Sequence, residues 1–187
     1  MFLYLICSYL IGTFLTAWWV GKWKKTDLSK IRSGNLGARN AGAVLGKGAF
    51  VITFLGDALK GALIVLIGSY YNFSVEIIAI GGLFAILGHL FPFWLKFKGG
   101  KGIATFIGIG LVLSPMLFGI MAACFIIFIA LSRSATLSML LAFSIFGVLC
   151  LFTSSLWPLS IGILIILIRH RFDIVDSWKK RWWKTRK

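Results

Sequence analysis

The sequence has few acidic residues and little charge of any kind. Its 187 residues include 5 Asp and Glu against 20 Lys and Arg, and only 13% of the chain is charged. Apolar residues make up 59% of the chain, and the mean hydropathy is +0.96. Such a chain is not a soluble domain, because its apolar runs approach the roughly 20 residues with which a helix crosses a bilayer. The composition therefore indicates a single integral membrane domain over residues 1–187.

Cysteine is scarce, and well-known nucleotide motifs are absent. Cys7, Cys124 and Cys150 are odd in number, lie in apolar runs and match no metal-site spacing. We therefore expect them to be small core residues, and we expect no metal. No Gly-x-x-x-x-Gly-Lys-Ser/Thr motif occurs, which argues against nucleotide hydrolysis. The net charge of +15 lies between apolar runs, so we assign it to membrane topology and expect no nucleic-acid partner.

Basic residues fall into four clusters, and Lys60 alone lies within an apolar run. The clusters are 22–47, 96–101, Arg133 and 169–187. Basic loops stay on the cytoplasmic side of a membrane, so all four clusters should face the cytoplasm. The pattern predicts an all-α integral membrane protein with about seven transmembrane segments, one or two of them short or half-spanning. Its N-terminus should lie outside and its C-terminus in the cytoplasm.

The apolar runs between the clusters predict the individual segments. The first run is retained as a span, because it lacks a basic start and leads into tryptophans and lysines. Ser114-Pro115 reads as a cap followed by a first-turn proline, which separates a half-length segment from the next helix. The predicted segments are 1–21, 44–67, 75–95, 103–113, 116–131, 135–152 and 157–168. The basic, amphipathic tail 169–187 should lie along the lipid headgroups.

Three inner loops combine glycine with hydrogen-bond donors. They are SGNLGARNAG at 33–42, FKGGKG at 97–102 and RHRFD at 169–173. Glycine lets backbone N–H groups approach an oxyanion, and a helix N-terminus adds donors and a favourable dipole. Lysine supplies a point charge and arginine a fork for two oxygens. We predict that the loops meet in a phosphate site. The alternative is that the lysines only set topology and the glycines only permit tight turns.

Three further polar residues lie inside apolar segments. Asp57 and Lys60 are three residues apart on one helix face and should point into the protein, because charge is costly in lipid. They are either a structural pair that locks helix packing or a substrate contact. His89 lies before the FKGGKG loop, and it is either a packing histidine bonded to a carbonyl or a substrate-binding residue.

These motifs resemble those of a known family. SGNLGARNAG, GDALKG (56–61), GHLFPFWLKFKGGKGIAT (88–105) and RHRFD occur in the order of the signature regions of the bacterial PlsY-type acyl-phosphate:glycerol-3-phosphate acyltransferases. The resemblance covers nearly the whole chain. It implies a seven-segment, multi-pass enzyme of the bacterial cytoplasmic membrane. Such an enzyme transfers a fatty acyl group from acyl phosphate to the sn-1 hydroxyl of glycerol 3-phosphate, giving lysophosphatidic acid and phosphate.

The resemblance also implies the partners and the site. It implies no cofactor, a membrane-lipid environment and, as a candidate partner, the enzyme that produces acyl phosphate. Together with the chemistry of the loops, it points to His170, Lys101 and Ser33 as catalytic. The proton of the hydroxyl goes either to His170 as general base or to the substrate's own phosphate. The predicted substrate- and phosphate-binding residues are Asn35, Gly37, Arg39, Asn40, His89, Lys98, Gly99, Gly100, Gly102, Thr136 and Asp173.

Several positions depart from the family pattern, among them Ser134, Thr136 and Met139 after Arg133, and three bear directly on phosphate binding. Arg39 stands where the family usually has Thr, and Ala43 stands where it has Arg, so Arg39 can supply the missing charge from a neighbouring position. Asp173 replaces a neutral Asn, and a carboxylate there repels phosphate unless it is protonated or paired with a basic residue. A transporter or a non-catalytic binding protein for a phosphorylated metabolite or lipid is the alternative reading. A transporter requires a polar path to the outer face, and only Asp57 and Lys60 would contribute to one.

Overall fold

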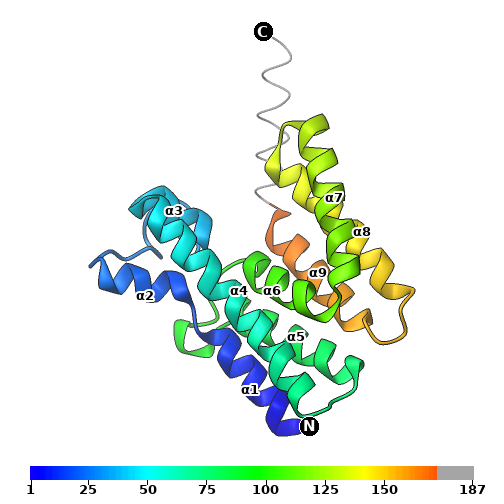
Figure 1. The fold of residues 1–187 in the computed structure, drawn as a ribbon. Helices are drawn as coiled ribbons and strands as arrows, with labels where there is room; N and C mark the ends of the chain where they lie inside the picture. The colour runs from blue at the N-terminus through cyan, green and yellow to red at the C-terminus, as the bar shows by residue number, and fades with distance from the viewer. Residues whose placement is uncertain (172–187) are drawn as a thin grey trace.

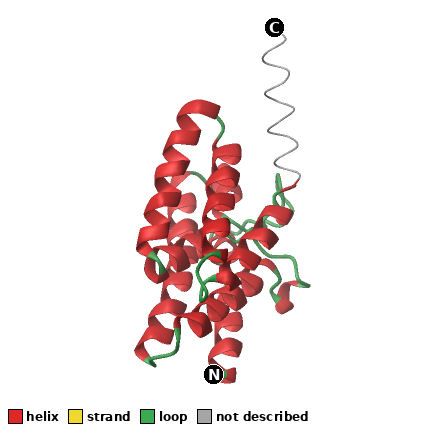
Figure 2. Ribbon diagram, turned by 90° about the vertical axis from the view of Figure 1, so that its right-hand side faces the viewer, coloured by secondary structure: helices red, strands yellow, loops and turns green. Residues whose placement is uncertain are grey.

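The computed structural model describes residues 1–171, which form helices joined by loops, with no strand among them (Figures 1 and 2). The predicted all-α class is therefore confirmed for this part of the chain. The predicted headgroup-bound tail lies almost wholly outside the described residues. The elements are α1 (Phe2–Thr13), α2 (Thr16–Trp23), α3 (Ala38–Leu45), α4 (Lys47–Tyr70), α5 (Val75–Leu90), a 3-10 turn η1 (Phe93–Leu95), α6 (Ile103–Leu113), α7 (Pro115–Ser132), α8 (Ala135–Leu151) and α9 (Trp157–Arg169).

Four helical segments are long and apolar enough to cross a membrane: Phe2–Trp23, Lys47–Tyr70, Val75–Leu95 and Pro115–Ser132. Three shorter apolar helices accompany them, namely Ile103–Leu113, Ala135–Leu151 and Trp157–Arg169. The short segment 103–113 was predicted with these bounds, and Pro115 begins α7 at its first position as the sequence indicated. The count of seven crossings and the sides of the two termini stay predictions.

The first predicted span corresponds to the candidate segment Phe2–Trp23, but it is not one continuous helix. Phe14 and Leu15 have extended backbone angles, which separate α1 from α2. Figure 1 shows α2 turning away from the axis of α1. At about 1.5 Å per residue, the 12 residues of α1 reach only about 18 Å, well short of a bilayer core of about 30 Å. The run carries no charged residue, and Phe14 and Leu15 themselves are apolar, so its charge pattern does not mark the break.

The second predicted span began at the wrong place. Instead of a helix over 44–67, the chain forms the short helix α3 and then the long helix α4. Gly46 separates them with a φ of 93°, a conformation that residues with a Cβ rarely adopt. At the other end of the next span, α5 stops at Leu90 because Pro92 cannot continue a helix.

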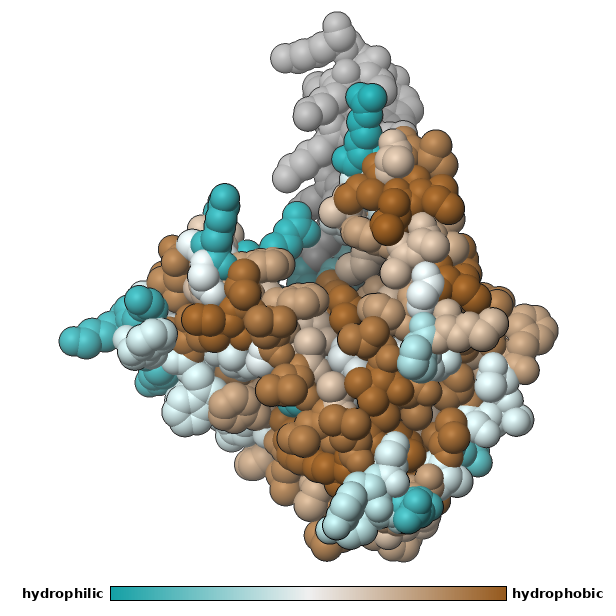
Figure 3. Space-filling model, in the orientation of Figure 1, coloured by the Kyte–Doolittle hydropathy of each residue, from teal (hydrophilic) through white to brown (hydrophobic). Residues whose placement is uncertain are grey.

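The helices differ widely in how much of them is buried. In the segment Val75–Leu95, 56% of the apolar window is buried, against 6% in α7. The core lies where α1, α4, α5, α6, α8 and α9 meet, and it contains the fully buried Phe106 and Phe146. The α7–α8 hairpin rises beyond the other helices (Figure 1). Its apolar outer face suits contact with lipid. Figure 3 shows mostly hydrophobic residues on the surface of this hairpin.

Candidate anion-binding site

Two helix N-termini lie next to each other at one end of the fold. The N-cap residues are Gly37 for α3 and Gly102 for α6, and neither has a side-chain cap. The loops before them touch, since a Cβ built on Gly100 would lie 2.9 Å from the Leu36 carbonyl oxygen. The first N–H groups of a helix have no partner within the helix, and the helix dipole favours negative charge there. The two ends together form a place where an oxyanion is favoured.

Arg39 connects this place to a third element. It lies in the first turn of α3, and its Nη1 donates to the hydroxyl oxygen of Thr136 at 3.5 Å. Thr136 belongs to the first turn of α8, 97 residues further along the chain. Lys101 is partly buried and immediately precedes Gly102. Two cationic side chains are thus attached directly to the two adjoining helix starts.

The C-terminal end of α9 forms the fourth side. Ile166 packs against the α6 start, since a Cβ on Gly102 would lie 3.1 Å from its Cγ1. One turn later, His170 is 4% exposed, and its Nδ1 lies 2.9 Å from the Ile166 carbonyl oxygen. A carbonyl only accepts, so Nδ1 carries the proton and a neutral ring has its lone pair on Nε2. The guanidinium of Arg169 stacks over the Phe91 ring at 5.6 Å.

The first two inner loops therefore adjoin, as the sequence predicted, and the third loop follows the part of α9 whose Ile166 packs against the α6 start. Figure 3 shows hydrophilic side chains around a hollow between the α2–α3 side and the α7–α8 hairpin. The last predicted phosphate contact, Asp173, lies outside the described residues.

The glycine loop uses its amides differently from the prediction. The Gly99 N–H donates to the Leu90 carbonyl at 3.1 Å, and the Gly100 N–H donates to the His89 carbonyl at 3.0 Å. These amides therefore hold the loop against the end of α5 and do not face a phosphate. A Cβ on Gly99 would collide with the His89 carbonyl oxygen, so this close backbone approach requires glycine. Donors for an anion come from the first turn of α6 instead.

The side chain of Asn40 also serves the protein backbone. It is 4% exposed, and its Nδ2 donates to the carbonyls of Leu28 at 3.0 Å and Ile31 at 3.3 Å. Both amide hydrogens are thus used to brace the loop before α3, in contrast to the predicted phosphate contact. Ser33 is exposed and Asn35 half-buried on the turn of the same loop.

Lys98 lies on a different side of the loop from the one expected. It lines a pocket of about 500 Å³ with Trp18, Lys22, Lys25 and Leu36, and Lys101 is not among the lining residues. Asp27 also lines it, and the Ser29 hydroxyl, which donates to its carboxylate at 2.6 Å, holds the pKa of Asp27 below its usual value. Leu36, which precedes the α3 start, also lines this pocket, so Lys98 faces a pocket that Lys101 does not line.

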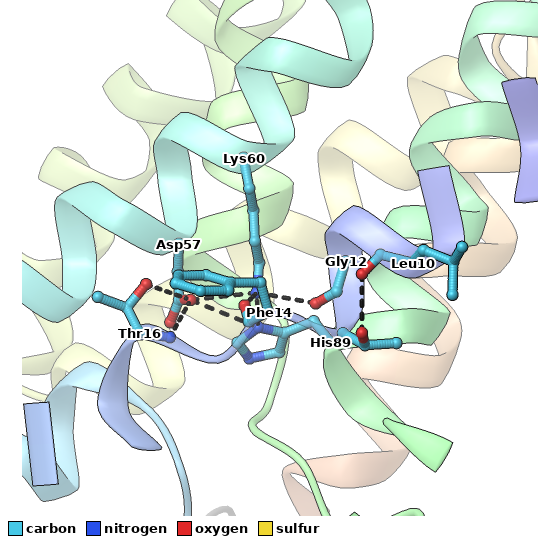
Figure 4. Close-up of polar contacts among 8 residues, drawn as sticks. Leu10, Gly12, Phe14, Thr16, Asp57, Lys60 and His89 are labelled. Atoms are coloured by element: carbon cyan, nitrogen blue, oxygen red, sulfur yellow. Dashed lines mark hydrogen bonds and ion pairs between the residues drawn. The ribbon is translucent and has the colours of Figure 1, made fainter. Parts of the chain in front are cut away.

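Asp57 and Lys60 point into the protein, as predicted, and form a buried ion pair with an Nζ–Oδ1 distance of 3.1 Å (Figure 4). Lys60 Nζ also donates to the carbonyls of Gly12 at 3.0 Å and Phe14 at 2.6 Å, while Asp57 accepts from the Thr16 hydroxyl at 3.1 Å. These contacts satisfy backbone groups at the break between α1 and α2. They support the structural alternative for the pair.

His89 is a buried packing histidine, 2% exposed, but its partner differs from the predicted carbonyl. Its Nδ1 lies 2.8 Å from Lys60 Nζ, so this nitrogen is bonded to the ammonium. Thr16 belongs to the same cluster and carried no signal in the sequence. The break at residues 14–15, which these side chains serve, appears only in the folded chain.

Comparisons with known proteins give consistent results. The sequence profile of the family described as "Glycerol-3-phosphate acyltransferase" matches residues 2–180. The chain is 47% identical over 137 residues to "Glycerol-3-phosphate acyltransferase 1" of Bacillus cereus, covering 72% of this chain and 75% of that protein. It is 39% identical over 189 residues to "Glycerol-3-phosphate acyltransferase" of Staphylococcus saprophyticus, covering 94% and 93%.

Solved structures agree with the sequence comparisons. The fold matches the crystal structure of PlsY, an integral membrane glycerol 3-phosphate acyltransferase, in its glycerol 3-phosphate form. The TM-score is 0.86 at 28% identity, over 96% of this chain and 92% of that one. The lysophosphatidic acid form of the same enzyme matches with a TM-score of 0.83.

Proposed function

The chain belongs to the glycerol-3-phosphate acyltransferase family, and on this premise we propose that its acyl donor is an acyl phosphate and that the reaction takes place at the hollow between α3, α6, α8 and α9. The acceptor is the sn-1 hydroxyl of glycerol 3-phosphate, and the products are lysophosphatidic acid and inorganic phosphate. The reaction needs a membrane environment, and we place the protein as a multi-pass enzyme in the bacterial cytoplasmic membrane with these helix starts at the cytoplasmic face.

One observation carries the proposal: two helix N-termini without side-chain caps adjoin each other, and each carries a cationic side chain, Arg39 on α3 and Lys101 before α6. Both substrates bear phosphate, so the reacting pair brings several negative charges to one place. Unused N–H groups, helix dipoles and two cations favour binding of those charges together. The same groups stabilise the charge that develops on the leaving phosphate.

The bond changes follow from this arrangement. The sn-1 oxygen attacks the carbonyl carbon of the acyl phosphate, a new ester C–O bond forms, and the C–O bond to phosphate breaks. The electron pair of the broken bond leaves with inorganic phosphate, next to Lys101 and the α6 start. Positioning contributes as well, because two anionic substrates held by neighbouring helix starts react as if in one molecule.

The hydroxyl proton needs an acceptor, and His170 is suited to the task. Its Nδ1 proton faces the Ile166 carbonyl, which puts the lone pair of a neutral ring on Nε2. A general base contributes typically about 10²–10⁴-fold to a rate. Oxygens of the substrate's own phosphate are the second candidate acceptor, and His170→Gln separates the two. A loss of about 100-fold or more supports the histidine, whereas a loss below about tenfold supports the substrate phosphate.

The buried polar residues do not favour transport. Asp57 and Lys60 were the only candidates for a polar path, and their contacts are with the α1–α2 break and with His89. A substrate path along them would require breaking these contacts.

The deciding experiment uses the purified chain in lipid nanodiscs with acyl phosphate and glycerol 3-phosphate, each alone and together. Release of inorganic phosphate that requires both substrates, with lysophosphatidic acid formed in equal amount, is the expected result. Acyl coenzyme A replaces acyl phosphate in a parallel arm. Equal or faster product formation with acyl coenzyme A contradicts the proposed donor.

A further inference from the structure

The ammonium of Lys60 is surrounded by four acceptors. They are the carbonyl oxygens of Gly12 at 3.0 Å and Phe14 at 2.6 Å, Asp57 Oδ1 at 3.1 Å and His89 Nδ1 at 2.8 Å. Lysine can only donate, so His89 Nδ1 accepts and its proton is on Nε2. The cluster therefore fixes the tautomer and the orientation of the His89 ring (Figure 4).

The far edge of that ring faces the glycine loop. A Cβ on Gly100 would collide with His89 Nε2 and would lie 2.8 Å from its Cε1. The loop is also tied to the backbone at the same place, because the carbonyls of His89 and Leu90 accept from Gly100 and Gly99. The imidazole thus forms a wall behind the loop that leads into Lys101 and the start of α6.

The opposite side of the cluster holds the break between α1 and α2. Asp57 Oδ1 accepts from the Thr16 hydroxyl at 3.1 Å and from the Thr16 N–H at 3.4 Å. Backbone groups released by a helix break need partners in apolar surroundings, and this cluster supplies them. One buried group of side chains therefore joins α1, α2, α4 and α5 to the loop.

We propose that Asp57, Lys60 and His89 are positioning residues for acyl transfer. They hold the 98–102 loop, and with it Lys101, in the position that phosphate binding requires. This rests on the proposed function of the loop. The three side chains do not touch substrate. They act through the packing of the His89 imidazole against Gly100. Loss of this packing should therefore weaken the binding of phosphate-bearing substrate more than it slows the chemical step.

A double-mutant cycle between His89 and Gly100 tests the contact. His89→Asn retains an acceptor oxygen near the position of Nδ1 for Lys60, but it removes the edge of the ring behind the loop. Gly100→Ala inserts a methyl group where that edge lies. The shorter side chain vacates the space at the two closest contacts of the methyl, so the double variant should be better than Gly100→Ala alone. The recovery should be partial, because the methyl still lies 2.9 Å from the Leu36 carbonyl oxygen. Contacting pairs are non-additive in this way, whereas distant ones are not.

The expected numbers are large enough to separate the outcomes. We expect kcat/KM to fall about 10-fold in His89→Asn and about 100-fold in Gly100→Ala, with the double variant regaining at least about 5-fold over the latter, since coupled neighbours depart from additivity by such factors. Both single variants should act mainly by raising KM for at least one of the two substrates. Losses that multiply to about 1,000-fold, or losses confined to kcat, overturn the proposal.

Gly119→Ala is the matched control. It makes the same substitution in α7, where a Cβ meets no atom within 4 Å. Activity should be unchanged, and the unfolding temperature should not fall, because alanine favours a helix interior over glycine. The same cycle is measured by thermal unfolding, where His89→Asn should restore part of the stability that Gly100→Ala removes. Thermal unfolding needs no enzymatic turnover. If the protein is inactive with acyl phosphate, the proposed function is refuted, but the unfolding cycle still decides whether the His89 ring packs against the loop. Additive unfolding effects reject the contact whatever the activity.

Discussion

Lys60 and Lys101 are both lysines near the glycine loop, yet they stand in opposite surroundings. Lys60 is 5% exposed, and its ammonium is bonded to a carboxylate, an imidazole and two carbonyls of the protein. Lys101 is only partly buried and directly precedes Gly102, the N-cap of α6. A charge buried among backbone and side-chain acceptors holds the fold together, whereas a charge at a helix start adds to the positive potential there and favours an anion. Removal of the first should cost stability, and removal of the second should cost activity.

The largest effect should come from Lys60→Met. The change leaves Asp57 charged and buried without its cation, and breaking one member of such a pair costs about 3–5 kcal/mol. Two carbonyls at the α1–α2 break also lose their donor. We expect little folded protein, or a large drop in unfolding temperature measured by intrinsic fluorescence in detergent. Lys60→Met combined with Asp57→Leu should recover part of the loss, and a single variant as stable as the parent would abolish the contrast between the two lysines.

Lys101→Ala should produce the reverse pattern. Loss of one group that stabilises transition-state charge typically lowers kcat by about 10²–10³. The unfolding free energy should change by no more than about 0.5 kcal/mol, as for most substitutions near the surface. Phosphate release and thermal unfolding measured on one preparation separate the two quantities. A large loss of unfolding free energy in the variant would show that Lys101 also stabilises the fold.

Arg39→Lys tests whether a positive charge alone is sufficient to bind substrate phosphate at the N-terminus of α3. The substitution keeps the charge but removes the planar fork that binds two oxygens and contacts Thr136. We expect kcat/KM to fall about 10-fold, close to the effect of losing one charged hydrogen bond of about 1.5 kcal/mol. The kcat/KM of Arg39→Ala should fall further, because the charge is lost as well. If both variants match the parent, the α3 start does not hold substrate phosphate.

The smallest effect should follow Asp173→Asn. Position 173 lies beyond the described residues, so the prediction rests on the sequence, which places a carboxylate where phosphate should bind. Two unit charges about 6 Å apart in a water-like dielectric repel by about 0.7 kcal/mol, and removing that repulsion should raise kcat/KM about threefold. Steady-state kinetics at two salt concentrations measures it, because screening weakens such repulsion. A strong decrease would mean that the carboxylate has a catalytic or structural partner.

The helices that sequence predicted best are those with marked ends. Segment 103–113 was predicted with the observed bounds because a glycine precedes it and a Ser-Pro pair follows it. The long helix α4 was merged with part of α3, although Gly46 was visible, because glycine inside an apolar run does not by itself reveal a positive φ. The break after Thr13 had no clear signal, since Phe14 and Leu15 are apolar and the hydroxyls of Thr13 and Thr16 are tolerated inside helices.

The sequence predicted the kind of site more successfully than the contacts of its individual residues. Glycine, lysine and arginine in three inner loops pointed to one anion site, and the loops do adjoin through Leu36, Gly100, Gly102 and Ile166. Which donors face outward was not predictable. The amides of Gly99 and Gly100 and the side chain of Asn40 look like phosphate ligands in sequence, but neighbouring carbonyls accept their hydrogens.

The sequence by itself determined that this protein is helical, with apolar segments long enough to cross a membrane, and that its positive charge gathers between those segments. Hydropathy and charge act on each segment separately, so a local pattern reveals them. Only the tertiary structure decided that α1 breaks at residue 14, that Lys60 and Asp57 satisfy the broken backbone, and that His89 stands behind Gly100. In apolar surroundings a backbone group or a charge must have a partner, and that partner comes from another helix far along the chain. A local pattern cannot contain it.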